Sequence, residues 1–323
     1  MRIVIPNFPA TDSFVDNVSH TLRNMGHEVL TPAVPLTGQR GALMRLWQDN
    51  LGKLFPERWT AAEKWVVSAV GKTTCDMVLC LTQSLRPEVL EILRGSVRHL
   101  VAWWGDCPAN MRGHGLLATA WDRIYLKDAA AVAKFRTAGL DAELMHEAMN
   151  PDWHRRRSSG VSDEVVVAGN YYGYRQFLSV RLMERGVEMA LYGPPPPRWS
   201  DRRIVAAHRG RYIVRDEKSE IFGAALACLN STALAEGDSL NCRAFEIAGA
   251  GGLQLIEDKP SVATCFEPGR EVVVFKSIDD IVEATARARA DRDWAHGIRE
   301  AGHARALAEH TYHHRLTRLL RSL

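Results

Sequence analysis

The six cysteines of this 323-residue chain include no C-x-x-C pair, so the usual spacing of a zinc site is missing. Their scatter also gives no disulfide framework of a small secreted protein, and we expect reduced thiols. His310, His313 and His314 could meet on one helix face, but a polar helix surface explains them more simply than a metal site. No metal site is therefore predicted. The cysteines are Cys75, Cys80, Cys107, Cys228, Cys242 and Cys265.

Long apolar runs are also missing. No stretch approaches the roughly 18 apolar residues that a membrane-spanning helix needs. The N-terminus passes directly into Arg2-Ile3-Val4-Ile5, which is too short for the core of a signal peptide. We therefore expect a cytoplasmic protein. Any membrane contact would be weak and peripheral, through the basic C-terminal region 278–323.

The chain has little excess of charge of one sign. Its 41 basic and 38 acidic residues give a net charge of +3, which gives no reason to expect nucleic acid as a partner. Hydrophobic residues make up 46% and charged residues 24%, the proportions of a soluble globular protein. The length predicts two domains, each able to bury its own core.

The beginning of the chain has the pattern of a β-α-β unit. A short apolar strand at 3–5 precedes a helical pattern over 12–25, which Gly26 closes, and a second strand follows at 27–30. A crossover of helix length predicts parallel strands in a right-handed unit. The unit has no G-x-G-x-x-G motif, which argues against a dinucleotide cofactor.

The same alternation continues through a predicted first domain, residues 1–155, and restarts in a predicted second domain, residues 161–323. Between them, Asn150–Gly160 is polar, charged and without apolar period, as in an interdomain linker. A mostly helical stretch at 40–72 carries Trp47, Trp59 and Trp65. Further helices are expected at 86–94, 128–138 and 278–323, and strands at 77–81, 99–104, 123–126, 142–145, 164–168, 187–192, 225–230, 253–257 and 271–275.

This repetition predicts an α/β fold of two Rossmann-like, doubly wound domains that face a central cleft, with a C-terminal helix. In open parallel sheets a ligand binds beyond the carboxyl ends of the strands. A ligand site in the cleft is therefore expected.

Residues 241–257 combine a polar loop, a short helix, a glycine-rich stop and a buried strand. Asn241 is the expected N-cap, so the amides of the first turn would face an anion such as a diphosphate. Glu246 lies between the apolar residues Phe245 and Ile247, which is an unusual place for a carboxylate.

Several short motifs follow one another over residues 164–323, and in this order they resemble those of the CgeB-like (spore-maturation-type) glycosyltransferases. The first half resembles that family only loosely, through the opening strand and helix that lead to Gly26-His27-Glu28-Val29 and through Trp104-Gly105-Asp106-Cys107-Pro108. The motifs of the second half are Gly169-Asn170-Tyr171-Tyr172-Gly173-Tyr174-Arg175, Leu191-Tyr192-Gly193, Leu229-Asn230, Asn241 to Ile247 with Gly251-Gly252, Phe266 to Glu271, and Ala301-Gly302 before His310 to Leu316.

The resemblance implies a GT-B architecture in which the second domain holds a nucleoside-diphosphate sugar and the first holds the acceptor. We expect a uridine-linked donor as co-substrate and no metal, so helix amides and arginines must neutralise the diphosphate. Arg243 and Arg175 would bind phosphate, Glu246 would accept from the ribose hydroxyls, and a backbone that approaches closely would need a glycine. The donor-binding residues implied are Gly169, Asn170, Arg175, Asp238, Asn241, Arg243 and Glu246.

Each of these assignments has a simpler alternative. Glu246 could pair with Arg243, three residues before it on the helix, and Arg175 could be a surface residue that opens a helix. The family's earlier acid, which holds sugar hydroxyls, is not matched cleanly by Glu236-Gly237-Asp238-Ser239, although Asp238 and Asn241 are near the right place.

An inverting transferase needs a base for the acceptor hydroxyl, and two aspartates follow strands of the first domain. We favour Asp106 slightly over Asp12. The simpler roles are an Asx turn before Pro108 for the first and an N-cap for the second. Of Trp103 and Trp104, one is expected in the core and one in the cleft wall. A retaining mechanism would need no such base.

The sequence thus predicts a metal-independent GT-B glycosyltransferase that moves a sugar to a glycan, glycolipid, protein or small-molecule acceptor. A nucleotide-sugar epimerase on the same fold is one alternative, and would turn over its donor without an acceptor. A non-catalytic sugar- or nucleotide-binding protein is the other.

Overall fold

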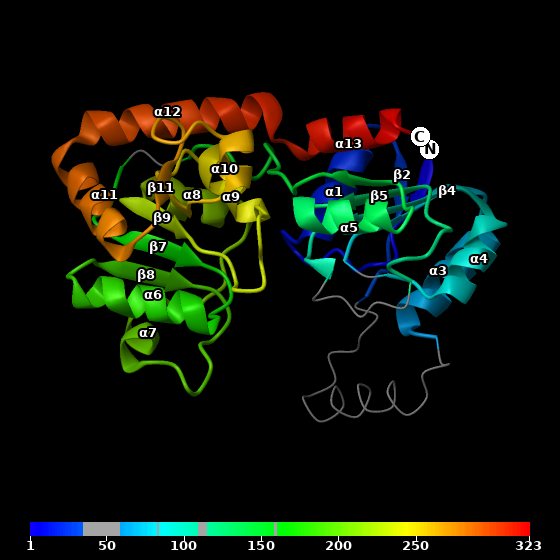
Figure 1. The fold of residues 1–323 in the computed structure, drawn as a ribbon, viewed down its shortest axis with the longest axis horizontal. Coiled ribbons are helices and arrows are strands. Elements are labelled where there is room, and N and C mark those ends of the chain that lie inside the picture. Colours follow the sequence, from blue (N-terminus) through cyan, green and yellow to red (C-terminus); the bar gives the residue numbers. More distant parts are fainter. Residues whose placement is uncertain (35–58, 83, 109–114, 158–159) are drawn as a thin grey trace. The chain divides into compact units, whose positions relative to one another are not determined.

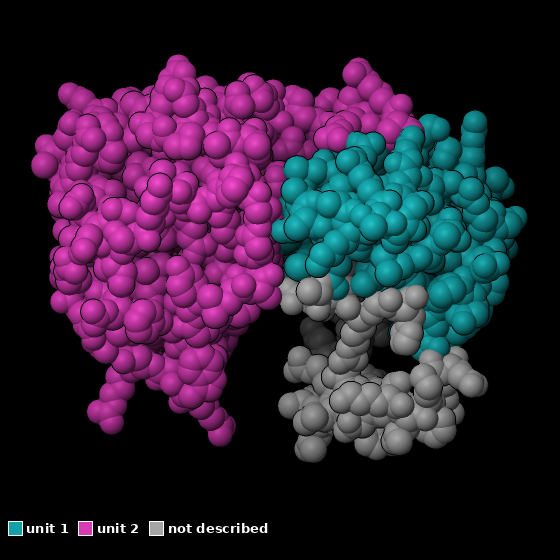
Figure 2. Space-filling view, in the orientation of Figure 1, with its two compact units in different colours: residues 1–145, 323 teal, residues 146–322 magenta. Residues whose placement is uncertain are grey.

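The computed structural model describes residues 1–34, 59–82, 84–108, 115–157 and 160–323. Within it the chain divides into two compact units, Met1–Met145 with Leu323 and His146–Ser322. Figure 2 shows them in teal and magenta. Residues 40–58 of the helical stretch predicted at 40–72, including Trp47, lie outside the described residues.

Unit 1 contains a six-stranded parallel sheet in the order β2-β1-β3-β4-β5-β6. Apolar residues make up most of every strand, as expected for a parallel sheet covered by helices. The strands are β1 Arg2–Val4, β2 Glu28–Leu30, β3 Cys75–Cys80, β4 Val97–Trp104, β5 Arg123–Leu126 and β6 Ala142–Leu144. The helices are α1 Phe14–Asn24, α3 Ala61–Lys72, α4 Pro87–Arg94 and α5 Ala129–Thr137 (Figure 1).

The first crossover confirms the predicted β-α-β unit, because β1 and β2 pair in parallel on either side of α1. The cap of α1 differs from the simpler role suggested for Asp12. Ser13 is the N-cap, and its side chain accepts a hydrogen bond from the amide of Asp16. Asp12 precedes the cap with a positive φ of 59°. Gly26 follows the helix with a φ of 85°, as its predicted place at the C-terminal end requires.

The core of unit 1 contains both tryptophans of β4, and neither is exposed. Trp104 packs edge-on against Trp121, with ring centroids 5.8 Å apart. Trp103 packs edge-on against Phe14 at 4.9 Å, and its indole N–H donates to the carbonyl of Met145. The prediction that one of them lines a cleft wall is therefore wrong. An indole can be buried completely here because its N–H finds an acceptor inside the unit.

Unit 2 contains a five-stranded parallel sheet in the order β11-β10-β9-β7-β8. The strands are β7 Val165–Ala168, β8 Met189–Tyr192, β9 Ala227–Asn230, β10 Gln254–Glu257 and β11 Val273–Phe275. The helices are α6 Gly173–Glu184, α7 Arg202–Ala207, α8 Arg215–Ala224, α9 Cys242–Gly249, α10 Pro260–Cys265, α11 Ile278–Ala290, α12 Arg292–Glu309 and α13 Tyr312–Arg321 (Figure 1). Each unit is thus a Rossmann-like layer of parallel strands and helices.

The segment predicted as a linker belongs to unit 2 instead. Asn150 is 1% exposed and His154 is fully buried, although Ser158 and Ser159 lie outside the described residues. The His154 ring accepts a hydrogen bond from the amide of Asn150 at 3.1 Å, which satisfies two polar groups at once. Residues 146–155, placed in the first domain by the sequence, also fall within unit 2.

The predicted C-terminal helical region is confirmed and consists of three helices, α11, α12 and α13. Capping boxes at Ser277 and Thr311 start the first and the third. Across the described ranges, no helix has both the length and the apolar character that crossing a bilayer would require.

Candidate functional site

Three strands of unit 2 lie side by side in the order β10-β9-β7 and end at the same edge of the sheet, because they are parallel. Gly169 follows β7, Ser231 follows β9, and Asp258 follows β10. Ligands of open parallel sheets bind beyond this edge. Most of the residues predicted to bind the donor follow these strands.

The turn after β7 is shaped by Gly169, whose φ of 123° is one that other residues rarely adopt. A side chain at Gly169 would overlap the guanidinium of Arg243 and lie 3.3 Å from an Nη atom of Arg175. The structure therefore brings these three predicted residues together. Asn170 belongs to the same turn, and its carbonyl accepts a hydrogen bond from Arg175.

Arg175 is only 2% exposed, so its alternative reading as a surface residue is wrong. Its Nε donates to Oγ of Ser231 at 3.1 Å, and an Nη donates to the carbonyl of the same residue. Burial lowers the pKa of Arg175, and the nearby positive charge of Arg243 lowers it further. An anion placed at this turn would relieve that repulsion between the two guanidiniums.

Helix α9 begins as the sequence predicted, with Asn241 as N-cap accepting from the amide of Ala244 at 3.1 Å. The side-chain amides of Asn241 and Asn230 exchange two hydrogen bonds of 3.2 Å. Arg243, in the first turn, donates to Oδ1 of Asn230 at 3.3 Å. The cap, the strand end and the arginine therefore hold one another in place.

One amide of that first turn already has an anionic partner from the protein. The amide of Cys242 donates to Oε2 of Glu147 at 3.1 Å. The expectation that these amides are open to a diphosphate is thus wrong for Cys242 in this structure. Glu147 lies in the segment that enters unit 2, and nothing in its sequence surroundings marked it as a partner of α9.

Glu246 is 3% exposed, and its partners differ from the alternative considered from the sequence. Nζ of Lys218 lies 3.1 Å from Oε2, and Nε2 of His154 lies 3.7 Å from Oε1. Because Nδ1 of His154 accepts from a backbone amide, its proton sits on Nε2 and faces Glu246. Glu246 therefore pairs with Lys218 of α8, while Arg243 bonds to Asn230.

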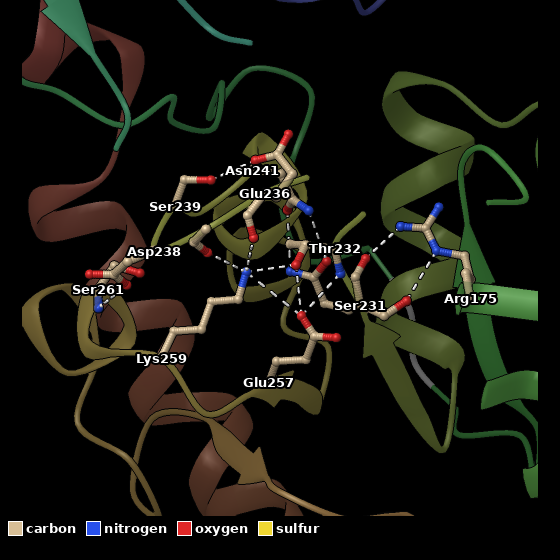
Figure 3. Close-up of polar contacts among 12 residues, drawn as sticks. Arg175, Ser231, Thr232, Glu236, Asp238, Ser239, Asn241, Glu257, Lys259 and Ser261 are labelled. Carbon is tan, nitrogen blue, oxygen red and sulfur yellow. Dashed lines mark hydrogen bonds and ion pairs between the residues drawn. The ribbon is translucent and has the colours of Figure 1, made fainter. Parts of the chain in front are cut away.

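Asp238 lies in the segment between β9 and α9, on the side of α10 (Figure 3). Its Oδ1 accepts from the amide of Ser261 at 2.8 Å, in the first turn of α10. The sequence placed this aspartate near the donor sugar without a clean motif. In the structure, one of its oxygens is used to join the segment to α10.

The two predicted bases lie in unit 1, each after a strand. Asp106 follows β4 and is exposed, and its Oδ1 accepts from the next amide, that of Cys107, at 2.9 Å. Asp12 is 9% exposed and accepts from the side-chain amide of Asn17 at 3.3 Å. Its own amide donates to Oδ2 of Asp16 at 2.8 Å.

Comparison with known proteins gives a match to one family model and to several solved structures. Residues 175–321 match the model of the glycosyl transferase-like family. Among solved structures, the sucrose-phosphate synthase of Thermosynechococcus elongatus superposes with a TM-score of 0.69 at 13% identity, over 100% of this chain and 98% of its own. The chain has the GT-B fold.

Two further solved structures agree with this fold. Anabaena HepE, solved in complex with UDP-glucose, superposes with a TM-score of 0.65 at 11% identity, over 100% of this chain and 99% of its own. AviGT4, a glycosyltransferase involved in avilamycin A biosynthesis, gives a TM-score of 0.60 at 14% identity, with 99% and 96% covered. No curated protein sequence matches the chain significantly.

Sequence reasoning missed three residues that hold the predicted donor-site residues in place, Lys218, Glu257 and Lys259. Lys218 lies in a charged helix, and Lys259 and Glu257 flank the end of β10. No periodicity distinguishes such residues from solvated surface residues. Their one signal is position, because Glu257 and Lys259 lie at the carboxyl end of a strand.

Proposed function

We propose that this protein is a glycosyltransferase that transfers a sugar from a nucleoside-diphosphate sugar to an acceptor hydroxyl. The observation that carries the proposal is the convergence of Arg175 and Arg243 on the Gly169 turn, at the ligand edge of a GT-B sheet. Two guanidiniums beside a backbone without a side chain suit the negative charge of a diphosphate. The family match over residues 175–321 supports the same chemistry.

In this reaction the bond between the anomeric carbon and the diphosphate oxygen breaks, and the nucleoside diphosphate leaves with the electron pair. Arg175 and Arg243 would stabilise the negative charge that develops on it. With two cations from the protein, the leaving group needs no metal, so we propose a metal-independent enzyme. Asp106, and after it Asp12, are the proposed bases if the acceptor hydroxyl is deprotonated by the protein.

The donor is proposed to be uridine-linked, because structures of Anabaena HepE, which share this fold, hold UDP or UDP-glucose. Glu246 is proposed to accept from the ribose hydroxyls, with its carboxylate held by Nζ of Lys218 at 3.1 Å. Gly169, Asn170, Asn241 and Asp238 complete the proposed donor site. The motifs over residues 164–323 support placement in the CgeB-like branch. A cytoplasmic location is part of the same proposal.

Thermal unfolding with UDP tests this proposal. At a concentration one hundred times its dissociation constant, UDP should stabilise the protein by about 2.7 kcal/mol. Arg243→Met removes a charged donor and should weaken UDP binding about 10- to 100-fold. The matched control, Arg202→Met on exposed helix α7, makes the same change of charge and should bind as the wild type does. If no nucleoside diphosphate or nucleotide sugar shifts the wild type, the proposed function is wrong.

A further inference from the structure

The segment that joins β9 to α9, residues 231–241, is fixed from three sides (Figure 3). Arg175 of α6 holds its beginning through Ser231. The amide of Ser261 in α10 holds Asp238, near its end. Between these two points, the segment is held by two side chains at the end of β10, Glu257 in its last position and Lys259 two residues later.

Lys259 makes most of those contacts. Its Nζ donates to Oγ1 of Thr232 at 2.6 Å, to the carbonyl of Gly237 at 2.9 Å and to the carbonyl of Glu236 at 3.3 Å. An ammonium has three N–H donors, and here three acceptors of one segment surround it. Nζ of Lys259 thus binds both ends of the 232–237 turn at once.

Glu257 adds a second attachment at the same place. Its Oε2 accepts from both the amide and the hydroxyl of Thr232, at 3.2 and 2.7 Å. The same oxygen lies 3.7 Å from Nζ of Lys259. The two side chains are only 15% and 14% exposed, so water competes weakly with these bonds. Removing either charge would leave the other poorly compensated.

The place of the Glu257–Lys259 pair in the fold indicates a role for the segment that it holds. The attached segment begins at the residue that Arg175 holds and ends at the N-cap of α9, Asn241. It therefore runs from the proposed diphosphate site along the edge of the sheet and carries Asp238. The ion pair and its hydrogen bonds hold the segment in one geometry, as recognition of a ligand requires, because a displacement of about 1 Å can cancel recognition.

We propose that Lys259 is a positioning residue that fixes segment 232–238 in the conformation that reads the sugar of the donor. The inference rests on the proposed function, and it assigns sugar selectivity to this segment and nucleotide affinity to Arg175, Arg243 and Glu246. Lys259 acts through the segment, because its own donors are directed to protein carbonyls and to Thr232.

Calorimetric titration with UDP and with a panel of UDP-sugars, including UDP-glucose, tests the inference. In the wild type, affinities should differ across the panel. In Lys259→Met, the affinity for UDP should stay within about twofold, while the ratio between the best and the worst sugar falls at least about tenfold. Lys276→Met is the matched control, because this exposed lysine pairs with Asp258 beside the same strand, and it should keep both quantities.

Because Lys259→Met leaves Glu257 with a poorly compensated charge and could fail to fold, Thr232→Val provides a second variant. It removes the hydroxyl that links Lys259 and Glu257 without changing the charge, and it should lower the selectivity ratio in the same direction. Lys259→Arg keeps the charge and should restore part of the ratio.

Selectivity that survives in Lys259→Met or Thr232→Val, or UDP affinity that falls in parallel with sugar affinity, would overturn the inference. A wild type without sugar selectivity would do the same. A wild type that binds neither UDP nor any UDP-sugar would overturn the proposed function, and this inference with it.

Discussion

His310 illustrates how one buried side chain can make the whole protein sensitive to pH. It lies between α12 and α13, is 5% exposed, and directs Nε2 to the carbonyl of Cys265 at 2.7 Å. Arg315 donates to Nδ1 at 3.0 Å, so Nε2 carries the proton and the ring is neutral. Burial lowers the pKa of His310 from 6.5 to about 4, although the bond to Cys265 opposes this, and the charges of Arg315, Arg305 and His146 lower it further.

This arrangement predicts a loss of stability in mild acid. Between pH 6.5 and 4 the unfolded chain binds a proton at His310 that the folded chain does not, so the free energy of unfolding falls as the pH falls. By pH 5 the loss from this residue should be about 2 kcal/mol, from the cost of about 1.4 kcal/mol per pKa unit. Urea unfolding at pH 7.5 and pH 5 measures it. His310→Gln, which keeps a donor and an acceptor, should lose less over the same range, and equal losses in both proteins would contradict the assignment.

At the scale of elements, the turn between β7 and α6 contains two glycines with different roles. Gly169 has a φ of 123°, and a side chain there would overlap Arg243. Gly173 begins α6, and an added Cβ would have no atom within 4 Å. The turn therefore needs a glycine at the first position and merely tolerates one at the second.

We expect Gly169→Ala to destabilise the protein by about 1–3 kcal/mol, the usual cost of a strained backbone. The displaced Arg243 should also lower UDP affinity about tenfold or more. Gly173→Ala is the matched control in the same turn, and it should leave UDP binding unchanged and raise stability by up to about 1 kcal/mol. Chemical unfolding and UDP titration of both variants check these results. If the two substitutions act alike, the close approach of Arg243 to Gly169 has no consequence.

The same elements show which features of the candidate site could be predicted from the sequence. Asn241 was predictable as the cap of α9, because capping depends on residue type and on neighbours a few positions away. The partners of Glu246 were not, because Lys218 and His154 come from distant segments, and no local rule specifies which charges meet. Polar composition also misled at Asn150 and His154, which are buried, with the backbone amide of Asn150 donating to the His154 ring. Local chemistry thus predicted elements and several donor-site candidates, whereas tertiary pairing determined how they are held.

At the scale of the whole molecule, each parallel sheet has its own core, so a ligand bound to one unit can stabilise that unit more than the other. The described Gly169 turn, the β9–α9 segment and α9 itself all belong to unit 2. Apolar strands of unit 1 build a core of their own, around residues such as Trp104 and Leu100. A donor bound as proposed therefore contacts polar segments at one sheet edge, and its stabilising effect should be greatest there.

Hydrogen exchange with and without UDP tests that expectation over the whole chain. Local opening of turns and helix ends should be suppressed where the ligand binds, so amides at 169–176 and 230–246 should exchange more slowly with UDP. The strands of unit 1 should change much less, because their exchange requires opening of a core that UDP does not contact in the proposed mode. Arg243→Met, measured at a UDP concentration that saturates the wild type only, should show no protection in either range. Protection confined to unit 1 would place the nucleotide in the other sheet and reverse the assignment of donor and acceptor domains.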